Sequence, residues 1–293
     1  MTPSGLNPSV EKGQIMTTRL VHRLRLHTLI CGGIAMLTIP ACREPTVNKD
    51  GRRPTTRIAT APTEVSSAPT NRLPRTAERA DERRQMVRRQ IADRGIASER
   101  VLEAMQNVPR HWFVPEPYTD SAYRDCALPI GYAQTISQPY IVALMTEALA
   151  LEHGDKVFEI GTGSGYQAAI LAELTDKVFT IEIVEPLAKR TFGLLQERGY
   201  DTIRTRIGDG HLGWPEEAPF DAIIVTCAPE DPPPALVEQL TVGGRMCIPV
   251  GGQSFGQDLV LLTKRADGAL DRKMLAPVRF VPMTGEAEAG SDP

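Results

Sequence analysis

Aromatic residues make up only 5% of the 293-residue chain, and histidine occurs only five times. The histidines lie far apart, at no spacing typical of zinc ligands, so we predict no metal site. Basic residues are not in excess either, because 33 Lys and Arg stand against 36 Asp and Glu, for a net charge of −3. Nucleic-acid partners usually require a basic face or stripe. We therefore expect no nucleic-acid partner.

Cysteine is also scarce, and its pattern excludes a disulfide framework. The five cysteines are Cys31, Cys42, Cys126, Cys227 and Cys247. They form no C-x-x-C pair, and their odd number does not fit a closed set of disulfides. Cys227 follows an apolar strand, and no nearby residue in the sequence would lower its pKa, so we expect a buried, inert thiol there.

The first 42 residues predict a leader. Three arginines between positions 19 and 25 precede the uncharged run 28–41, which is too short to span a membrane but has the length of an export signal. The run ends Leu-Thr-Ile-Pro-Ala-Cys42, which resembles a bacterial lipoprotein signal and suggests a lipid anchor at Cys42. The alternative is a misassigned start followed by a fortuitously apolar leader.

Composition then divides the rest of the chain. Residues 43–76 are rich in Pro, Thr, Arg and Ala, and they contain too little apolar surface to offset their ordering entropy, so we predict a disordered tether. Hydrophobic residues make up 41% of the whole chain, enough for a real core. We place that core in a domain over residues 77–285, followed by a loose tail over residues 286–293.

A glycine-rich loop is the most informative stretch of this domain. The apolar run 156–160 predicts a strand, Gly161-x-Gly163-x-Gly165 follows it, and residues 167–174 read as a helix. A second strand, 178–181, ends in Glu182, where nucleotide-binding α/β units keep an acid for ribose hydroxyls. The glycine spacing is one residue tighter than the pyrophosphate-binding Gly-x-Gly-x-x-Gly. It favours an adenosyl ligand without phosphates.

The remaining pattern predicts an α/β, Rossmann-like, doubly wound fold. We expect a mostly parallel sheet of about seven strands with helices on both faces and an N-terminal helical extension. The further strands are expected at 202–207, 220–226, 245–250, 259–263 and 278–281, and the helices at 77–94, from Ser98, from Pro139, between Pro186 and Gly199, and at 235–240.

Two polar residues have two interpretations each from local sequence. Ser137 lies in the loop 128–140, just before a helix that starts near Pro139, so it either caps that helix or serves a site. Asp209, in Gly-Asp-Gly after the third strand, either stabilises a turn or faces a ligand at the carboxyl edge of the sheet.

With these residues laid out, the chain closely resembles the protein-L-isoaspartate O-methyltransferase family over residues 80–285. The resemblance rests on Phe113-Val114-Pro115, Leu128-Pro129-Ile130-Gly131, Gln134 to Pro139, Glu159 to Gln167, Gly208-Asp209-Gly210, Ala218 to Thr226, Gly243-Gly244-Arg245, Ile248 to Gly251 and Val278 to Pro282. The joint occurrence of these stretches in this order is very specific.

The resemblance implies a role for each matching residue. It assigns the catalytic role to Ser137, whose hydroxyl would orient a substrate carboxylate. The residues that it implies for cofactor binding are Glu159, Gly161, Gly163, Gly165, Glu182, Asp209 and Gly210, and those of the substrate loop are Gln134, Thr135 and Ile136. Glu182 would accept the ribose hydroxyls, and Asp209 the adenine amino group.

The implied reaction is the repair of damaged proteins. S-adenosyl-L-methionine would give a methyl group to the free carboxylate of an L-isoaspartyl residue, which is ionised near neutral pH and needs no strong base. The methyl ester would close to a succinimide without the enzyme, and hydrolysis would return some L-aspartate. The partners are then isoaspartyl proteins and peptides, bound as flexible, extended segments beside residues 131–140. We expect a monomer.

Several alternatives remain at this point. A nicotinamide-dependent oxidoreductase shares the glycine turn and the ribose acid, although it would need the longer glycine spacing. A noncatalytic module that binds damaged proteins is supported only by Ala133, which replaces a usual glycine and would strain the loop if its φ is positive. The cofactor and the family favour the cytoplasm, whereas Cys42 favours an exported, membrane-anchored lipoprotein.

Overall fold

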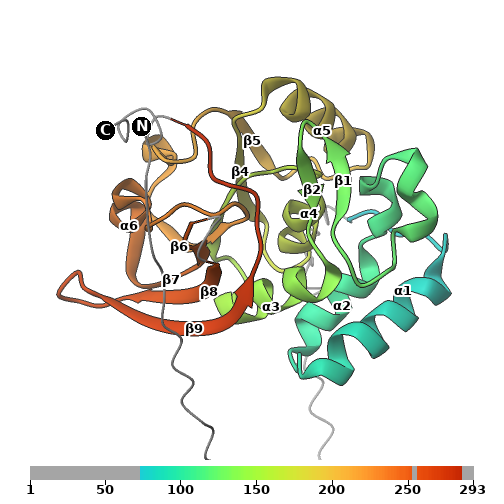
Figure 1. The fold of residues 1–293 in the computed structure, drawn as a ribbon, viewed down its shortest axis with the longest axis horizontal. Coiled ribbons are helices and arrows are strands. Elements are labelled where there is room, and N and C mark those ends of the chain that lie inside the picture. The colour runs from blue at the N-terminus through green and yellow to red at the C-terminus, as the bar shows by residue number, and fades with distance from the viewer. Residues whose placement is uncertain (1–72, 253–255, 286–293) are drawn as a thin grey trace, which may run out of the picture. The chain divides into compact units, whose positions relative to one another are not determined.

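A seven-stranded sheet with helices on both of its faces forms the framework of the domain (Figure 1). The computed structural model describes residues 73–252 and 256–285. The predicted leader, its Cys42 and the tail at 286–293 lie outside the described residues. So does most of the predicted tether.

The strand order is β5-β4-β3-β6-β7-β8-β9. The first five strands in this order pair in parallel, and β7-β8 and β8-β9 pair antiparallel. The strands are β3 (Lys156–Ile160), β4 (Lys177–Glu182), β5 (Arg204–Ile207), β6 (Phe220–Val225), β7 (Leu240–Val250), β8 (Gln257–Lys264) and β9 (Leu270–Val278). The chain order reverses between β3 and β6, which places a crevice at the carboxyl ends of these strands.

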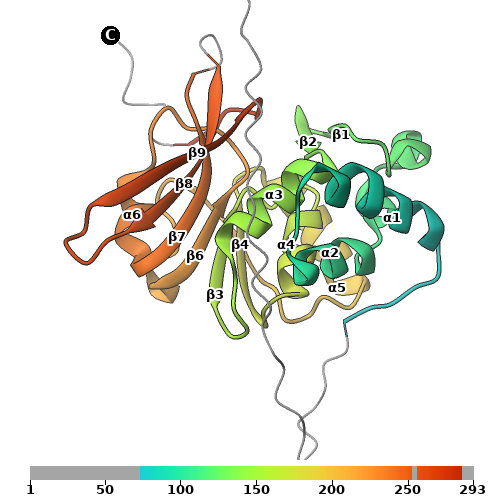
Figure 2. The ribbon, with the colours of Figure 1, turned by 90° about the horizontal axis from the view of Figure 1, so that it is seen from below.

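Six α-helices are described: α1 (Ala80–Met86), α2 (Glu99–Asn107), α3 (Pro139–Leu149), α4 (Tyr166–Ala172), α5 (Glu185–Glu197) and α6 (Pro234–Gln239). Shorter helical turns are η1 (Val87–Ile91), η2 (Ala92–Arg94), η3 (Arg110–Phe113), η4 (Glu116–Ser121) and η5 (Pro215–Glu217). In Figure 2, α3 and α4 lie on one side of the sheet and α6 on the other. Among the described residues, no helix has the length and apolarity needed to cross a membrane.

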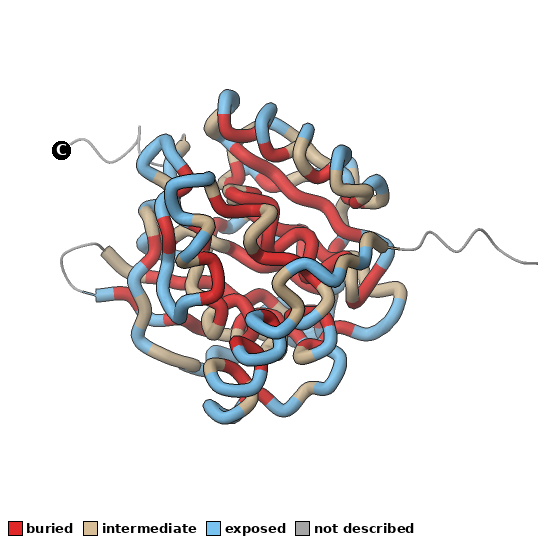
Figure 3. The backbone as a smooth tube through the Cα atoms, turned by 90° about the vertical axis from the view of Figure 1, so that its right-hand side faces the viewer, coloured by how far each residue is buried: buried red, intermediate tan, exposed pale blue. Residues whose placement is uncertain are grey.

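The central strands β3, β4 and β6 are buried on both faces, as their continuous apolar runs predict. Successive residues alternate between two core clusters, with Val157 packing on one face and Phe158 on the other. Figure 3 shows the buried residues gathered in the interior, beneath an exposed outer layer. Glu159 follows on the same face as Val157. The alternation therefore places the carboxyl group of Glu159 in the core between the sheet and helices α3 and α4.

The structure confirms the predicted fold class and most of its elements. Pro139 lies in the first turn of α3, and Gly199, at φ 81°, follows the end of α5. Ser98 caps α2, because its hydroxyl accepts a hydrogen bond from the Val101 N–H at 3.4 Å. The helix predicted at 77–94 is observed as one continuous helical stretch that starts at Ala80, and it passes from α to π to 3-10 geometry before Gly95.

Two predictions require correction. The strand expected at 278–281 instead covers Leu270–Val278, and the residues after it form only an isolated bridge between Pro282 and Ala228. The stretch 128–140, read as a loop, contains an antiparallel hairpin of β1 (Leu128–Gly131) and β2 (Gln134–Ile136). The part of the tether closest to the domain also packs against it, since Arg75 donates two 2.8 Å hydrogen bonds to Glu173.

Candidate functional site

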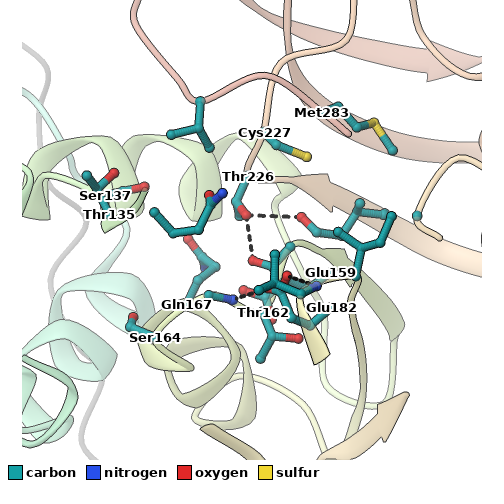
Figure 4. A pocket seen from close by; sticks show the side chains of 18 of the residues that line it. Thr135, Ser137, Glu159, Thr162, Ser164, Gln167, Glu182, Thr226, Cys227 and Met283 are labelled. Carbon is teal, nitrogen blue, oxygen red and sulfur yellow. Dashed lines mark hydrogen bonds between the residues drawn. The ribbon is translucent and has the colours of Figure 1, made fainter. Parts of the chain in front are cut away.

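A hollow that is partly open to solvent lies at the carboxyl ends of β3, β4 and β6. We call it the glycine-loop hollow. It brings together most of the predicted site residues, namely Gln134, Thr135, Ile136, Ser137, Glu159, Gly161, Gly163, Glu182 and Gly210. Figure 4 shows Thr135 and Ser137 on one side of the hollow and Glu159 and Glu182 on another, with Thr226 between them.

Backbone hydrogen bonds hold the glycine loop against β4. The N–H groups of Gly161 and Thr162 donate to the Ile181 carbonyl at 2.9 and 3.1 Å. Gly161, at φ 89°, also packs so closely on Thr226 that an added Cβ would stand 2.6 Å from its hydroxyl oxygen. Only glycine meets both demands without strain, which explains the first glycine of the pattern.

Glu159 is fully buried beneath this loop. Its Oε2 accepts a 2.5 Å hydrogen bond from the Thr180 hydroxyl, while its Oε1 has no hydrogen-bond partner among the described residues. Burial raises the pKa of Glu159 to about 8, and the neighbouring Glu182 carboxylate acts in the same direction, whereas the Thr180 hydrogen bond opposes both. Glu159 is therefore mostly protonated at neutral pH, and one of its oxygens remains available at the hollow.

Glu182 ends β4 and fixes the loop from the other side. Its Oε2 accepts the Gly163 N–H at 2.8 Å, and its Oε1 accepts the Val184 N–H at 2.9 Å. An ionised carboxylate has about four lone-pair directions, so it can accept further hydrogen bonds from a ligand while it keeps these two. Two vicinal hydroxyls are the kind of donor that this carboxylate would bind.

Ser137 does not cap α3. The N-cap residue is Gln138, which makes no side-chain capping bond, and the Ser137 hydroxyl donates to no other described residue. Its partly buried side chain instead lines the glycine-loop hollow. The capping interpretation is therefore wrong, and the hydroxyl remains available for a ligand.

A second hollow adjoins the first on its outer side. We call it the outer groove; its lining includes Gln138 and residues 277–281. The two hollows have four residues in common, Thr135, Ser137, Thr226 and Val281. Three of these four carry hydroxyl groups, so polar side chains mark the passage from one hollow to the other.

Thr226 is the residue that sequence reasoning missed at this junction. Its hydroxyl lies 2.6 Å from the Gly161 carbonyl oxygen and 3.0 Å from that of Ile160, so it donates its proton to the glycine loop. Its position at the end of β6 was the available signal, because ligand sites favour that edge. The C-terminal segment with Val281 and Met283 also lines the hollow, and no local sequence pattern predicts this contact.

Two predicted site residues do not line the hollow. Gly165 (φ 85°) precedes α4, and Asp209 accepts the His211 N–H at 2.8 Å. Cys227 does line it and is only partly buried, which corrects the expectation of a buried residue. The pKa of its thiol is nevertheless raised by burial to about 12, consistent with an inert thiol. Ala133 has a φ of 57°, so the condition for a strained turn is met.

The donor set of the hollow suits an adenosyl amino acid. It offers a carboxylate, Glu182, a buried unpaired carboxyl oxygen on Glu159, and backbone made accessible by glycines. Among residues 73–252 and 256–285, no group of three or more His, Cys, Asp or Glu side chains could hold a metal ion.

Comparison with protein families adds independent evidence. Residues 81–288 match the family model of protein-L-isoaspartate(D-aspartate) O-methyltransferase. A relative from Opitutus terrae, named protein-L-isoaspartate O-methyltransferase, is 58% identical over 208 residues, which cover 71% of this chain and 89% of the relative. One of the same name from Gloeobacter violaceus is 55% identical over 201 residues, covering 69% of this chain and 98% of the relative.

Solved structures agree with these matches. A protein-L-isoaspartate O-methyltransferase superposes with a TM-score of 0.63 at 26% identity, covering 69% of this chain and 66% of its own. The structure of a Plasmodium falciparum protein, described as a putative enzyme of that name in complex with S-adenosyl-L-homocysteine, superposes with a TM-score of 0.61 at 23% identity, covering 69% of this chain and 98% of its own. The second likeness shows the fold alone.

Proposed function

The chain belongs to the protein-L-isoaspartate O-methyltransferase family, and we propose that the junction of its two hollows is where methyl transfer takes place. The enzyme transfers a methyl group from S-adenosyl-L-methionine to the free carboxylate of L-isoaspartyl residues in damaged proteins and peptides. The methyl ester then closes to a succinimide, and hydrolysis of this ring converts some of the damaged residues to L-aspartate. The observation that supports this location is the set of residues shared by both hollows, Thr135, Ser137, Thr226 and Val281.

The glycine-loop hollow would hold the methyl donor, which supplies an electrophilic methyl group on a sulfonium when bound. In this assignment Glu182 accepts the ribose hydroxyls and the glycine loop lies along the donor. Glu159, whose Oε1 has no hydrogen-bond partner among the described residues, orients the loop or the donor's ammonium. We propose that the adenine end lies near Gly210, which lines the hollow, and that its amino group donates to Asp209.

The outer groove would hold the peptide. In this proposal the free Ser137 hydroxyl donates a hydrogen bond to the isoaspartyl carboxylate and aims one of its oxygens through the junction. The carboxylate is already ionised near neutral pH, so no residue has to act as a strong base. Holding the reacting groups in line and excluding water can contribute on the order of 7 to 11 kcal/mol to lowering the barrier.

Methyl transfer to a peptide pair tests the role of Ser137. Wild type and Ser137→Ala are incubated with labelled S-adenosyl-L-methionine and an isoaspartyl peptide or its aspartyl twin. We expect label on the isoaspartyl peptide only, and a loss of kcat of about a hundredfold or more in Ser137→Ala, because one oriented hydrogen-bond donor at a reaction centre contributes about that much. Ser164→Ala, which also lines the glycine-loop hollow but not the junction, is the matched control.

Each outcome has a clear meaning. Full activity in Ser137→Ala would remove Ser137 from the reaction while leaving the enzyme's activity intact. Label on the aspartyl twin as well would contradict selectivity for the isoaspartyl linkage. An unchanged dissociation constant for the cofactor in Ser137→Ala would show that the loss lies in peptide positioning and not in an unfolded site.

For the location in the cell, we propose the cytoplasm, where S-adenosyl-L-methionine is made. Wild type and Cys42→Ser should then appear in the same soluble fraction. Wild type in the membrane fraction, with a shift to the soluble fraction on Cys42→Ser, would instead establish the lipid anchor that the leader suggests.

A further inference from the structure

The outer groove contains one charged side chain, that of Arg279. The other side chains that line the groove are apolar or neutral and polar. Arg279 directly follows β9, two residues before Val281, which lies at the junction with the glycine-loop hollow. A peptide in this groove, with its isoaspartyl carboxylate at Ser137, therefore passes close to the positive charge of Arg279.

The backbone that directly follows Arg279 is held by two contacts. The buried Gln257 side chain clamps Phe280, since its Oε1 accepts the Phe280 N–H at 2.5 Å and its Nε2 donates to the Phe280 carbonyl at 3.2 Å. The next residue, Val281, accepts a 2.8 Å hydrogen bond from the Ala228 N–H. The position of the Arg279 Cα is thus set by contacts with two other strands or loops.

The guanidinium of Arg279 is exposed and, within the described part of the chain, makes no hydrogen bond or ion pair. The acids Glu230, Asp231 and Asp258 line an adjoining hollow that shares Pro277 and Val278 with the groove. None of them pairs with Arg279. Among the residues described, the Arg279 guanidinium is therefore an unpaired positive charge at the wall of the groove, and the three carboxylates line the neighbouring hollow instead.

We propose that Arg279 is a specificity-determining residue that binds an acidic side chain of the substrate, close in sequence to the isoaspartyl residue. The inference rests on the proposed function, because it takes the outer groove as the peptide site. In an extended peptide, residues two apart point to the same face about 6.6 to 6.8 Å from each other, so a carboxylate two residues from the damage can face the groove wall together with it. A guanidinium binds a carboxylate through two parallel hydrogen bonds.

Peptide pairs that differ in one side chain test this proposal in the full-length protein. Fluorescein-labelled isoaspartyl peptides carry Glu, Gln or Lys two residues before or after the damage. Dissociation constants come from fluorescence anisotropy with S-adenosyl-L-homocysteine present, and kcat/KM comes from methyl transfer. The variants are Arg279→Gln and Arg279→Glu, with Arg272→Gln as the matched control, an exposed arginine that lines the adjoining hollow but not the groove.

For wild type we expect Glu to improve binding at one of the two positions, either before or after the isoaspartyl residue. At that position the Glu peptide should bind about two- to fivefold more tightly than the Gln peptide, as an exposed ion pair allows. In Arg279→Gln the Glu and Gln peptides should bind equally tightly. Arg279→Glu should bind the Lys peptide more tightly than the Glu peptide. Arg272→Gln should keep the wild-type preference. The preference should also shrink at high salt, because it is electrostatic.

Three results would overturn the proposal: equal binding of Glu and Gln peptides by wild type, the same ratio in Arg279→Gln as in wild type, or an equal loss for all peptides in Arg279→Gln. The last would mean that Arg279 holds the isoaspartyl carboxylate itself or supports the fold. Absence of methyl transfer to any peptide by wild type would contradict the proposed function instead. The anisotropy ratios would still decide the role of Arg279.

Discussion

Glu159 shows how a strand residue acquires unusual chemistry from its position alone. Within β3 it alternates with Phe158 and Ile160, which pack on the opposite face, so it must enter the helix-covered core. Burial disfavours the charged form of a carboxyl group and raises its pKa, here to about 8. The sequence predicted that Glu159 lies in the strand that precedes the glycine loop, but the protonation of its carboxyl group depends on how completely neighbouring elements cover it.

This raised pKa makes stability depend on pH. Between the unfolded value of 4.5 and about 8, the unfolded chain releases the Glu159 proton while the folded protein keeps it. The contribution is therefore fully present below about pH 4.5, and it is lost as the pH rises to about 8, by up to about 1.4 kcal/mol per pH unit. Glu159→Gln imitates the protonated form and should unfold with a flatter pH profile.

Melting temperatures at pH 5, 6, 7 and 8 measure the difference. Wild type should lose more stability over this range than Glu159→Gln, and Glu238→Gln, an exposed substitution, should follow wild type. Parallel profiles for wild type and Glu159→Gln would show that Glu159 is ionised in the folded protein.

Ser137 marks the limit of prediction for single residues. Local sequence allowed a helix cap or a site residue, and only the resemblance to a family favoured the second. The structure excludes the cap because α3 takes Gln138 as its N-cap. Whether a serine one position earlier faces a ligand depends on residues far away, such as Thr226 and Val281, which no spacing rule connects to it.

The β1-β2 hairpin could not be recognised from the sequence pattern of its turn. Two-residue hairpins are recognised by Asn-Gly or similar pairs that accept positive φ. Here Gly131, Tyr132 and Ala133 have φ values of 89°, 53° and 57°, and only the first is glycine. Arg190 of α5 anchors the hairpin by donating a 2.6 Å hydrogen bond to the Ile130 carbonyl. Tertiary contacts therefore support a turn whose own residues do not favour it.

Glycine at position 133 should relieve this strain. A non-glycine residue in the left-handed region costs about 1 to 2 kcal/mol, while glycine adds about 0.5 to 1 kcal/mol of unfolded-state entropy. Ala133→Gly should thus stabilise the protein by up to about 1 kcal/mol, or about 2 to 4 °C in melting temperature. Ala150→Gly, at φ 44° after α3 and away from the hollow, is a control that should gain a similar amount. A lower melting temperature in Ala133→Gly would mean that this turn is not strained.

β9 was misplaced for a related reason. It lies at the edge of the sheet, where a strand has one partner, and it carries Asp271, Arg272 and Lys273 as well as Pro277. Charged residues and proline are tolerated at edges, yet they hide the apolar pattern by which strands are recognised. The short apolar stretch after Val278 was the more conspicuous signal, and it instead forms the wall of the site.

At the scale of the whole molecule, the parallel part of the sheet was predictable because β3, β4 and β6 read as apolar runs ending in polar or glycine residues. The pattern placed Glu159 and Glu182 at the same edge, and the structure brings both to one hollow. The C-terminal segment around Met283 could not be predicted there, because it returns to the sheet only through non-local contacts with Ala228.

The glycine-loop hollow draws its walls from both faces of the sheet. Glu159 and Tyr166 belong to the helix-covered side, while Ile160, Ile181 and Met283 belong to the opposite core. The hollow therefore exists only while both cores are folded, and a ligand in it opposes global unfolding. At a hundred times its dissociation constant such a ligand adds about 2.7 kcal/mol of stability. Saturating methyl donor should therefore reduce the population of globally unfolded chain, which is the form that proteases cleave.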